Sequence, residues 1–159
     1  MAKYYSFIVK NVNPLSQNNR PTRLLQQYRT QLIGPFQQKY RIPPPAIRHG
    51  YIRKPIALHG KAIYIHKAKD SKDADNISKP LWDALNMYLY DDDNQIIHRQ
   101  VVKAYLGDPD IYNLHEFDLT HVGSTEFTEL VYFILDSTNT DDRLIYIDIS
   151  DYESKNVKF

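Results

Sequence analysis

Three consecutive segments constrain the fold of this chain more than any other feature, because they follow the order strand, helix, strand. Residues 56–66 alternate enough between apolar and polar side chains for a strand. Residues 75–90 have helical spacing, with Leu81 and Leu85 on one face, and residues 95–106 are typical of a second strand. A helix that returns the chain to an adjacent strand indicates an α/β (α+β) domain.

The rest of the chain completes a small mixed sheet packed with helices. We expect a single domain over residues 1–159, because this length can bury a real core. The central helix contains Pro80, which lacks a backbone donor, so its regular part should begin near Ser78 or Lys79. Further expected segments are a strand at 5–9, a helix at 22–32, a proline-rich loop at 34–49, an ambiguous apolar segment at 127–135 and a last strand at 144–149.

Charge is distributed unevenly along the chain. Residues 1–69 contain 13 Lys and Arg and no Asp or Glu, whereas residues 70–159 contain 7 basic and 19 acidic residues. The first part therefore points to a polyanionic partner. The alternative is that the two parts neutralise each other in the fold.

Other compositional features narrow the setting. The chain has no cysteine, so disulfides and thiolate metal sites are excluded. We find neither a signal-peptide pattern at the start nor an apolar stretch of membrane-spanning length, and we expect a cytoplasmic protein that does not bind membranes.

Two groups of acidic residues flank the central helix. Asp73 and Asp75 lie two residues apart, and residues 91–93 are three consecutive aspartates. Carboxylates are hard ligands for Mg²⁺ or Mn²⁺, and several that converge repel each other unless a cation lies between them. Lys79 beside them suggests that the other partner of the metal is a phosphate. We interpret this pattern as a candidate metal site for phosphodiester chemistry.

Simpler interpretations remain open for these residues. Lys79 is four residues from both Asp75 and Asp83, which is also the spacing of a helix-surface ion pair. Residues 91–93, taken alone, would be a solvated turn, and they fail the EF-hand spacing. Tyr40 and Tyr51 could stack on bases, although most tyrosines pack in a core.

Read together, the motifs resemble the RusA family of Holliday-junction resolvases, which are crossover-junction endodeoxyribonucleases. An early Pro-x-Ser-x-Asn segment at 14–20 adds to the match. The matching core is Asp73-Ala74-Asp75-Asn76-Ile77-Ser78-Lys79, Asp83-Ala84-Leu85-Asn86, Asp92-Asp93-Asn94-Gln95-Ile96 and Val101-Val102-Lys103.

This resemblance implies a homodimer that makes paired, symmetric nicks across a four-way DNA junction in recombination and repair, with Mg²⁺ as cofactor and Mn²⁺ as an alternative. By position, the metal ligands are Asp73, Asp75 and Asp93, and Lys79 is the catalytic lysine. Asp92 would support these ligands or bind the metal more weakly. The lysines expected nearest the DNA are Lys67, Lys69 and Lys72. The alternative function is a non-catalytic DNA- or protein-binding module on the same fold.

One segment departs from the family pattern. Residues 107–142 intervene where the family has a short loop, and they contain 9 Asp and Glu and no Lys or Arg. An acidic insertion would not lie on DNA. The options are a cap over the fold, a dimer contact or a partner-binding site.

Overall fold

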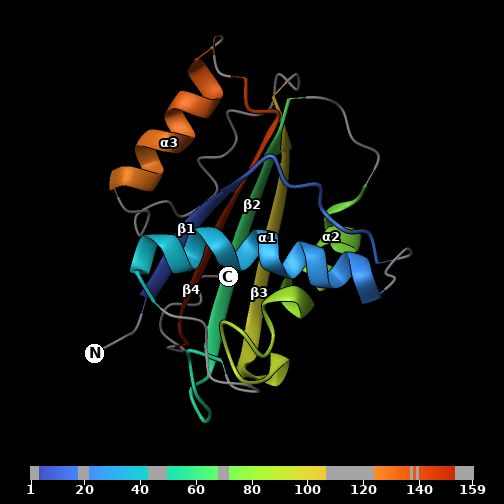
Figure 1. Ribbon diagram of the computed structural model, residues 1–159, viewed down its shortest axis with the longest axis vertical. Helices are drawn as coiled ribbons and strands as arrows, with labels where there is room; N and C mark the ends of the chain where they lie inside the picture. Colours follow the sequence, from blue (N-terminus) through green and yellow to red (C-terminus); the bar gives the residue numbers. More distant parts are fainter. Residues whose placement is uncertain are drawn as a thin grey trace.

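A four-stranded mixed sheet forms the centre of the molecule (Figure 1). The computed structural model describes residues 4–17, 22–42, 50–67, 72–106, 124–136, 138 and 140–152. The strand order is β1-β4-β2-β3, with β2 parallel to β3 and β4 antiparallel to both β1 and β2. The strands are β1 (Tyr4–Lys10), β2 (Leu58–His66), β3 (Ile96–Tyr105) and β4 (Arg143–Asp151). The expected mixed sheet is confirmed.

Alternate residues of β2 show how the helices cover the sheet. Ala62 and Tyr64 belong to the large core that includes the buried residues of α1 (Thr22–Tyr40) and α2 (Ala74–Leu85). Ile63 and Ile65 belong to a second core under α3 (Ser124–Leu135). Since successive side chains of a strand point to opposite faces, α1 and α2 lie on one face and α3 on the other.

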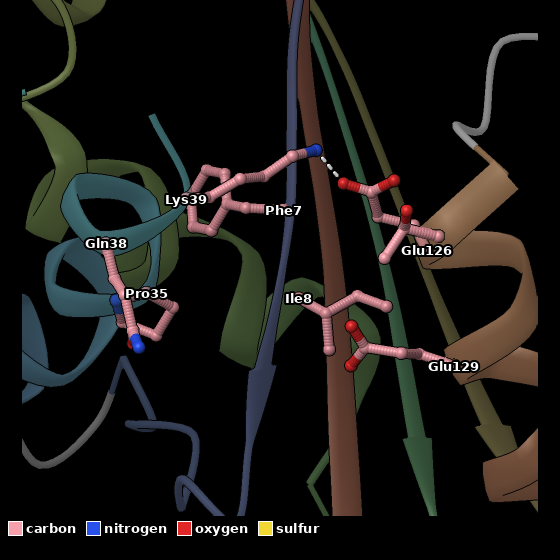
Figure 2. Close-up of a pocket in the computed structure, with 8 residues that line it drawn as sticks. Phe7, Ile8, Pro35, Gln38, Lys39, Glu126 and Glu129 are labelled. Carbon is pink, nitrogen blue, oxygen red and sulfur yellow. Dashed lines mark ion pairs between the residues drawn. The ribbon is translucent and has the colours of Figure 1, made fainter. Parts of the chain in front are cut away.

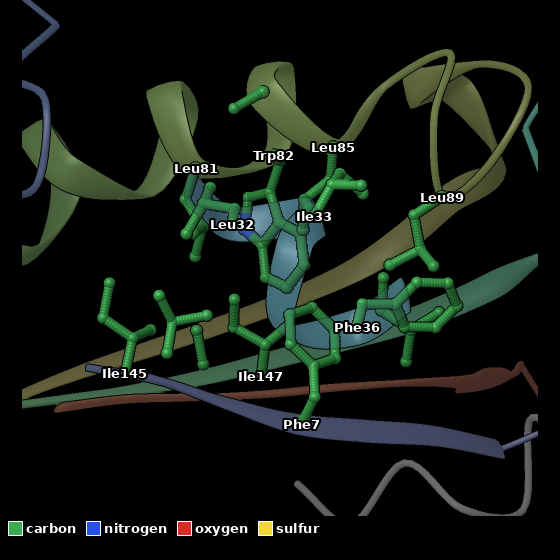
Figure 3. Packing of buried hydrophobic residues seen from close by; sticks show 14 of the residues in the cluster. Phe7, Leu32, Ile33, Phe36, Leu81, Trp82, Leu85, Leu89, Ile145 and Ile147 are labelled. Carbon is green, nitrogen blue, oxygen red and sulfur yellow. The ribbon is translucent and has the colours of Figure 1, made fainter. Parts of the chain in front are cut away.

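The large core is built around Trp82, which is fully buried (Figure 3). Its ring packs over Gly60 of β2, where a Cβ atom would come within 2.8 Å of a ring carbon. Phe36 of α1, also fully buried, lies 5.4 Å from the Phe7 ring of β1, centroid to centroid. The face under α1 and α2 is therefore closely packed from β1 to β2.

Proline did not end either helix where the sequence indicated. α1 continues through Pro35 to Tyr40. The expectation of a loop at 34–49 was therefore wrong for residues 34–40. α2 begins at Ala74, not near Ser78, and continues through the buried Pro80. Burial of Phe36 and Trp82 just after each proline outweighs the lost backbone hydrogen bond, because a fully buried aromatic ring contributes several kcal/mol.

α2 is shorter than the sequence predicted, since it ends at Leu85 rather than residue 90. Met87 then adopts a left-handed conformation, with φ of 66°, which no regular helix can continue through. The irregular segment leads into the short 3-10 helix η1 (Asp93–Gln95), which directly precedes β3.

The acidic insertion provides α3, which caps the second face of the sheet. Leu130 and Phe133 point into the second core. Figure 2 shows Lys39 of α1 reaching past β1 to form an ion pair with the buried Glu126 of α3. Of the three roles considered for the insertion, the cap is the one seen here. None of the helices in the described ranges is long and apolar enough to cross a membrane.

Candidate functional site

The start of α2 presents two carboxylates to solvent. Asp73 occupies the N-cap position, but its side chain makes no capping hydrogen bond. Asp75 lies in the first turn, and both residues are exposed. Helix N-termini attract negative charge, which helps to hold two acids so close together. Two carboxylates that point to solvent beside each other are suited to binding a cation.

A lysine on β3 fixes the chain just before Asp73. The ammonium of Lys103 donates a hydrogen bond to the backbone carbonyl of Lys72. Lys103 pairs with Tyr64 in the parallel register, near the ends of β2 and β3. Two lysines therefore border the Asp73 backbone, and a phosphate oxygen approaching the carboxylates would meet positive charge.

Lys79 lies one turn after Asp75 on the same helix. Its ammonium is 3.6 Å from a carboxylate oxygen of Asp83, and the Lys79 side chain is 47% exposed. An ion pair this exposed contributes about 0–1 kcal/mol. The pairing that the simpler interpretation expected is present, and it leaves the ammonium accessible from solvent.

The aspartates before β3 differ in what they bind. Asp91 accepts hydrogen bonds from the backbone of Gly50, at 2.8 Å, and of Lys54, at 3.1 Å, so it anchors the preceding loop. Asp92 caps η1 by accepting from the Asn94 backbone at 3.0 Å. The Lys54 ammonium, 2.5 Å from Asp92, together with that backbone bond, lowers the pKa of Asp92 to about 2. Asp91 and Asp92 are thus structural anchors rather than a solvated turn.

Asp93 is the half-buried first residue of η1, and its backbone carbonyl accepts from the Arg99 guanidinium at 3.1 Å. The register of β2 and β3 pairs Leu58 with Ile96 at one end and His66 with Tyr105 at the other. Asp93 precedes the first of these ends, whereas Asp73 follows the second.

One subunit therefore keeps the two groups of acids apart. Within the described ranges, no three His, Asp or Glu side chains come together as a possible metal site. The expectation that α2 brings Asp73, Asp75 and Asp93 to one point within a single chain is not met there. A twelve-residue helix is about 18 Å long, and it separates the two groups.

The carboxylates of α2 still fit a magnesium ion. Mg²⁺ retains several waters in proteins and takes one or two carboxylates together with substrate phosphates. Asp73 and Asp75 supply that number of hard oxygen ligands at an exposed position. The chain has no cysteine whose thiolate would favour a softer metal.

The lysines proposed to contact DNA are placed differently from one another. Lys72 adjoins Asp73, and Lys69 lies outside the described residues. The Lys67 ammonium lies 5.2 Å from the centre of the Phe133 ring of α3, so it points to the opposite face of the sheet from α2.

The two tyrosines considered for base stacking are partly buried and pack against the core. The Tyr40 hydroxyl exchanges two 2.9 Å hydrogen bonds with the backbone of Ser6. The Tyr51 ring lies against Phe36, with 5.3 Å between ring centres. Both rings are used in packing.

Three positions have roles that the sequence did not assign to them. Lys103 and Arg99 hold the backbones of Lys72 and Asp93, and the buried Gln95 donates to the Ile56 carbonyl at 3.0 Å. A cation within a predicted strand was the available signal for the first two. Lys103 and Arg99 are not adjacent in sequence to Lys72 and Asp93, whose backbones they bind. The sequence pattern alone therefore could not identify these contacts.

A comparison with known protein families identifies the part of the chain that contains these residues. The family model described as endodeoxyribonuclease RusA matches residues 17–112, which is more than half of the chain. The matched range contains both groups of acids and Lys79, and it ends before α3. No curated protein matches the chain.

Proposed function

Because this chain belongs to the RusA endodeoxyribonuclease family of Holliday-junction resolvases, we propose that it nicks both strands of a four-way DNA junction symmetrically, as a metal-dependent homodimer. Branched DNA is the substrate that the family implies. The observation that carries the proposal is the pair of exposed carboxylates at the start of α2, bordered by lysines, within the range that matches the family.

In this proposal Asp73, Asp75 and Asp93 are the metal ligands, with Mg²⁺ as the ion and Mn²⁺ as a substitute. When bound, such an ion would act as a Lewis acid toward the scissile phosphate and would lower the pKa of a water bound to it. Lys79 has an accessible ammonium that would neutralise the charge developing on the phosphate. Lys103 holds the Lys72 carbonyl and so keeps Asp73 in position.

The DNA backbone is expected to follow the positive charge beside the carboxylates. Lys72 is the proposed phosphate contact at this end of the sheet, and Lys67 is a more distant one on account of its contact with Phe133. Lys69, which lies outside the described residues, is the third proposed contact. Phosphate contacts of this kind position a duplex without reading its sequence. The proposed specificity is therefore for the shape of the junction.

The alternative is a binding module that retains the fold without cleaving DNA. It is favoured by the separation of Asp93 from Asp73 and Asp75 within one described subunit. Such a module would bind four-way junctions in the presence of EDTA and leave them intact when Mg²⁺ is added.

A cleavage assay distinguishes the two functions. End-labelled four-way, forked and linear DNA is incubated with the protein in Mg²⁺ or in EDTA. We expect symmetric nicks in the four-way junction only with Mg²⁺. Asp73→Asn, Asp75→Asn and Asp93→Asn should each abolish nicking and retain junction binding, because each removes a ligand and one charge that repels phosphate.

Asp136→Asn, just after α3, is the matched control and should cleave normally. If the three active-site variants cleave at the wild-type rate, the assignment of the ligands is wrong. If wild-type protein binds junctions but never cleaves them with Mg²⁺ or Mn²⁺, the binding module is the correct function.

A further inference from the structure

Two histidines lie side by side on neighbouring strands of the sheet. His59 of β2 pairs with His98 of β3 in the parallel register, and their ring centres are 4.4 Å apart. His59 is four residues before Ile63 and His98 is four before Val102, so both rings lie on the face of the sheet that carries the second core. The proposed phosphodiester chemistry uses neither ring.

An irregularity in the register brings these two rings together. Leu58 pairs with Ile96, whereas the next residue, His59, pairs with His98, so Ile97 is an extra residue in β3. Without this shift His59 would lie opposite Ile97, and the His98 ring would point to the other face of the sheet. Bulges of this kind re-aim side chains and are frequent beside functional sites.

Both rings have a buried nitrogen that the described residues leave without a hydrogen-bond partner. These atoms are Nε2 of His59 and Nδ1 of His98, and His59 as a whole is 9% exposed. A buried polar nitrogen that makes no hydrogen bond is unfavourable and rare in folded proteins. Two such nitrogens on adjacent rings therefore indicate a common occupant that both can bind.

The charge around the rings permits a cation. Burial disfavours the charged imidazolium form of His59, and a neutral imidazole is the form that binds a metal ion. Lys61 is the nearest cation along β2, and it lies directly across from Asp148 of β4. The Asp148 side chain is buried, so its carboxylate opposes the charge of Lys61 in a region of low dielectric constant.

We propose that His59 and His98 together bind one divalent transition-metal ion, such as Zn²⁺, with water as its other ligands. Two imidazoles on one ion, with metal–nitrogen distances of about 2.0–2.1 Å, have ring centres about 5 Å apart. The observed 4.4 Å is close to that separation, so a small rotation of the side chains is sufficient. A site with two protein ligands agrees with the lack of any three-residue group in the described ranges.

This site differs in chemistry from the carboxylates of α2. Imidazole nitrogen suits Zn²⁺, Cu²⁺ and Ni²⁺, whereas Mg²⁺ prefers oxygen ligands. The bound ion would tie β2 to β3 beside η1, which directly precedes β3. The proposal is independent of the nuclease function, because it uses other residues and another class of ion.

A metal titration tests the site. Protein stripped of metal with a chelator is titrated with Zn²⁺ by calorimetry, in an excess of Mg²⁺ that occupies the carboxylates. We expect one Zn²⁺ to bind per chain. His59→Gln and His98→Gln should each weaken this binding by at least roughly 10-fold, because each leaves a single imidazole. Since His59 is buried, the half-buried His98 provides the variant less at risk of unfolding.

Two control variants separate this site from other binding. Gln100→Ala changes the next residue of β3 on the same face, and the Asp73→Asn/Asp75→Asn double variant removes the carboxylates of α2. Both should bind Zn²⁺ as the wild type does. Unchanged binding in both histidine variants, loss of binding in the double variant, or no binding by the wild type would each overturn the proposal.

Nitrogen-15 NMR of the histidine rings identifies the atoms that bind. Zn²⁺, but not Mg²⁺, should shift the resonances of His59 Nε2 and His98 Nδ1. If a water alone bridges the two nitrogens, Zn²⁺ will leave both resonances unchanged, and the proposal is wrong. In thermal melting, Zn²⁺ at about 100 times its dissociation constant should raise the melting temperature by roughly 5 °C. None of these measurements depends on DNA cleavage, so the nuclease function and this site can fail separately.

Discussion

At the scale of single residues, the two roles of Lys79 predict different effects on the cleavage rate and on stability. As the group that stabilises charge on the phosphate, it should affect kcat more than DNA affinity, and Lys79→Ala should slow cleavage by roughly 10²-fold or more. As a partner of Asp83 alone, 3.6 Å away, it would contribute less than about 1 kcal/mol. Single-turnover cleavage and chemical unfolding of the same variant distinguish the roles. Asp83→Asn is the control, because it removes the ion pair and keeps the ammonium.

His59 makes stability depend on pH. Burial first, then the neighbouring His98 and Lys61, lower the pKa of His59 from 6.5 to about 4. The unfolded chain therefore binds a proton between these values that the folded chain does not. Stability should fall as pH decreases from about 6.5 to 4, by at most about 1.4 kcal/mol per pH unit, and then level off with respect to this group.

Urea unfolding at a series of pH values measures this slope, and His59→Gln should reduce it. His98 stacks edge-on against His59, with 4.4 Å between ring centres, and it is the titratable neighbour on β3. A variant with the same slope as the wild type would show that another group causes the pH dependence.

At the scale of elements, the contact between α2 and β2 depends on a glycine. A Cβ atom at Gly60 would come within 2.8 Å of the fully buried Trp82 ring, which has no space to move. Gly60→Ala should therefore destabilise the fold by about 1–3 kcal/mol. Gly34→Ala is the matched control, because a methyl group there would meet no atom within 4 Å, and in the helix α1 it should stabilise by up to about 1 kcal/mol.

Opposite signs for these two substitutions in guanidinium unfolding would support the packing described. Equal effects would mean that Trp82 does not pack over β2 in this way.

The buried and exposed faces of α3 should also respond differently to substitution. Leu130 is 5% exposed and packs in the second core, whereas Tyr132 is 62% exposed. Leu130→Ala should cost about 2–5 kcal/mol, because it leaves a cavity, and Tyr132→Ala should stay within about 0.5 kcal/mol of the wild type. Thermal melting of both variants is the measurement. Similar losses would show that the outer face of α3 is also covered.

At the scale of the whole molecule, ion pairs within the fold neutralise part of the uneven charge of the sequence. Lys10 pairs with Glu129 at 3.3 Å, Lys54 pairs with Asp92 at 2.5 Å, and Lys39 pairs with Glu126. Each of these pairs joins the basic first part of the chain to the acidic second part. The interpretation in which the two parts neutralise each other therefore accounts for some of the asymmetry, and the DNA surface must use the other cations.

The salt dependence of junction binding identifies those cations. Lys72→Glu should weaken binding to every DNA shape and reduce the log–log salt slope by roughly one unit, because it removes one phosphate contact. Lys67→Glu should have a smaller effect, since that ammonium lies against Phe133 on the other face of the sheet. Fluorescence anisotropy at several salt concentrations gives both slopes. A larger change for Lys67→Glu would place the DNA on the α3 side.

The sequence by itself determined the strands, the presence of α1 and α2 and the acidic motifs, because these depend on periodicity and on residues close together in the chain. The apolar segment at 127–135 stayed ambiguous, and only the structure shows that it belongs to the helix α3. The last strand, expected at 144–149, is the centre of β4, and the family resemblance carried by residues 73–103 is confirmed. Local patterns of this kind survive folding because β-strand alternation and helical spacing directly decide which side chains are buried.

Tertiary structure decided where the helices end and how far apart the two groups of acids lie. Pro35 and Pro80 lie inside helices because Phe36 and Trp82 are buried beside them, and that burial depends on strands far away in sequence. The parallel register of β2 and β3 places Asp93 at one end of β3 and Asp73 beyond the other. Sequence spacing fixes how far apart two residues are along the chain, whereas strand direction and register decide how far apart they lie in the folded subunit.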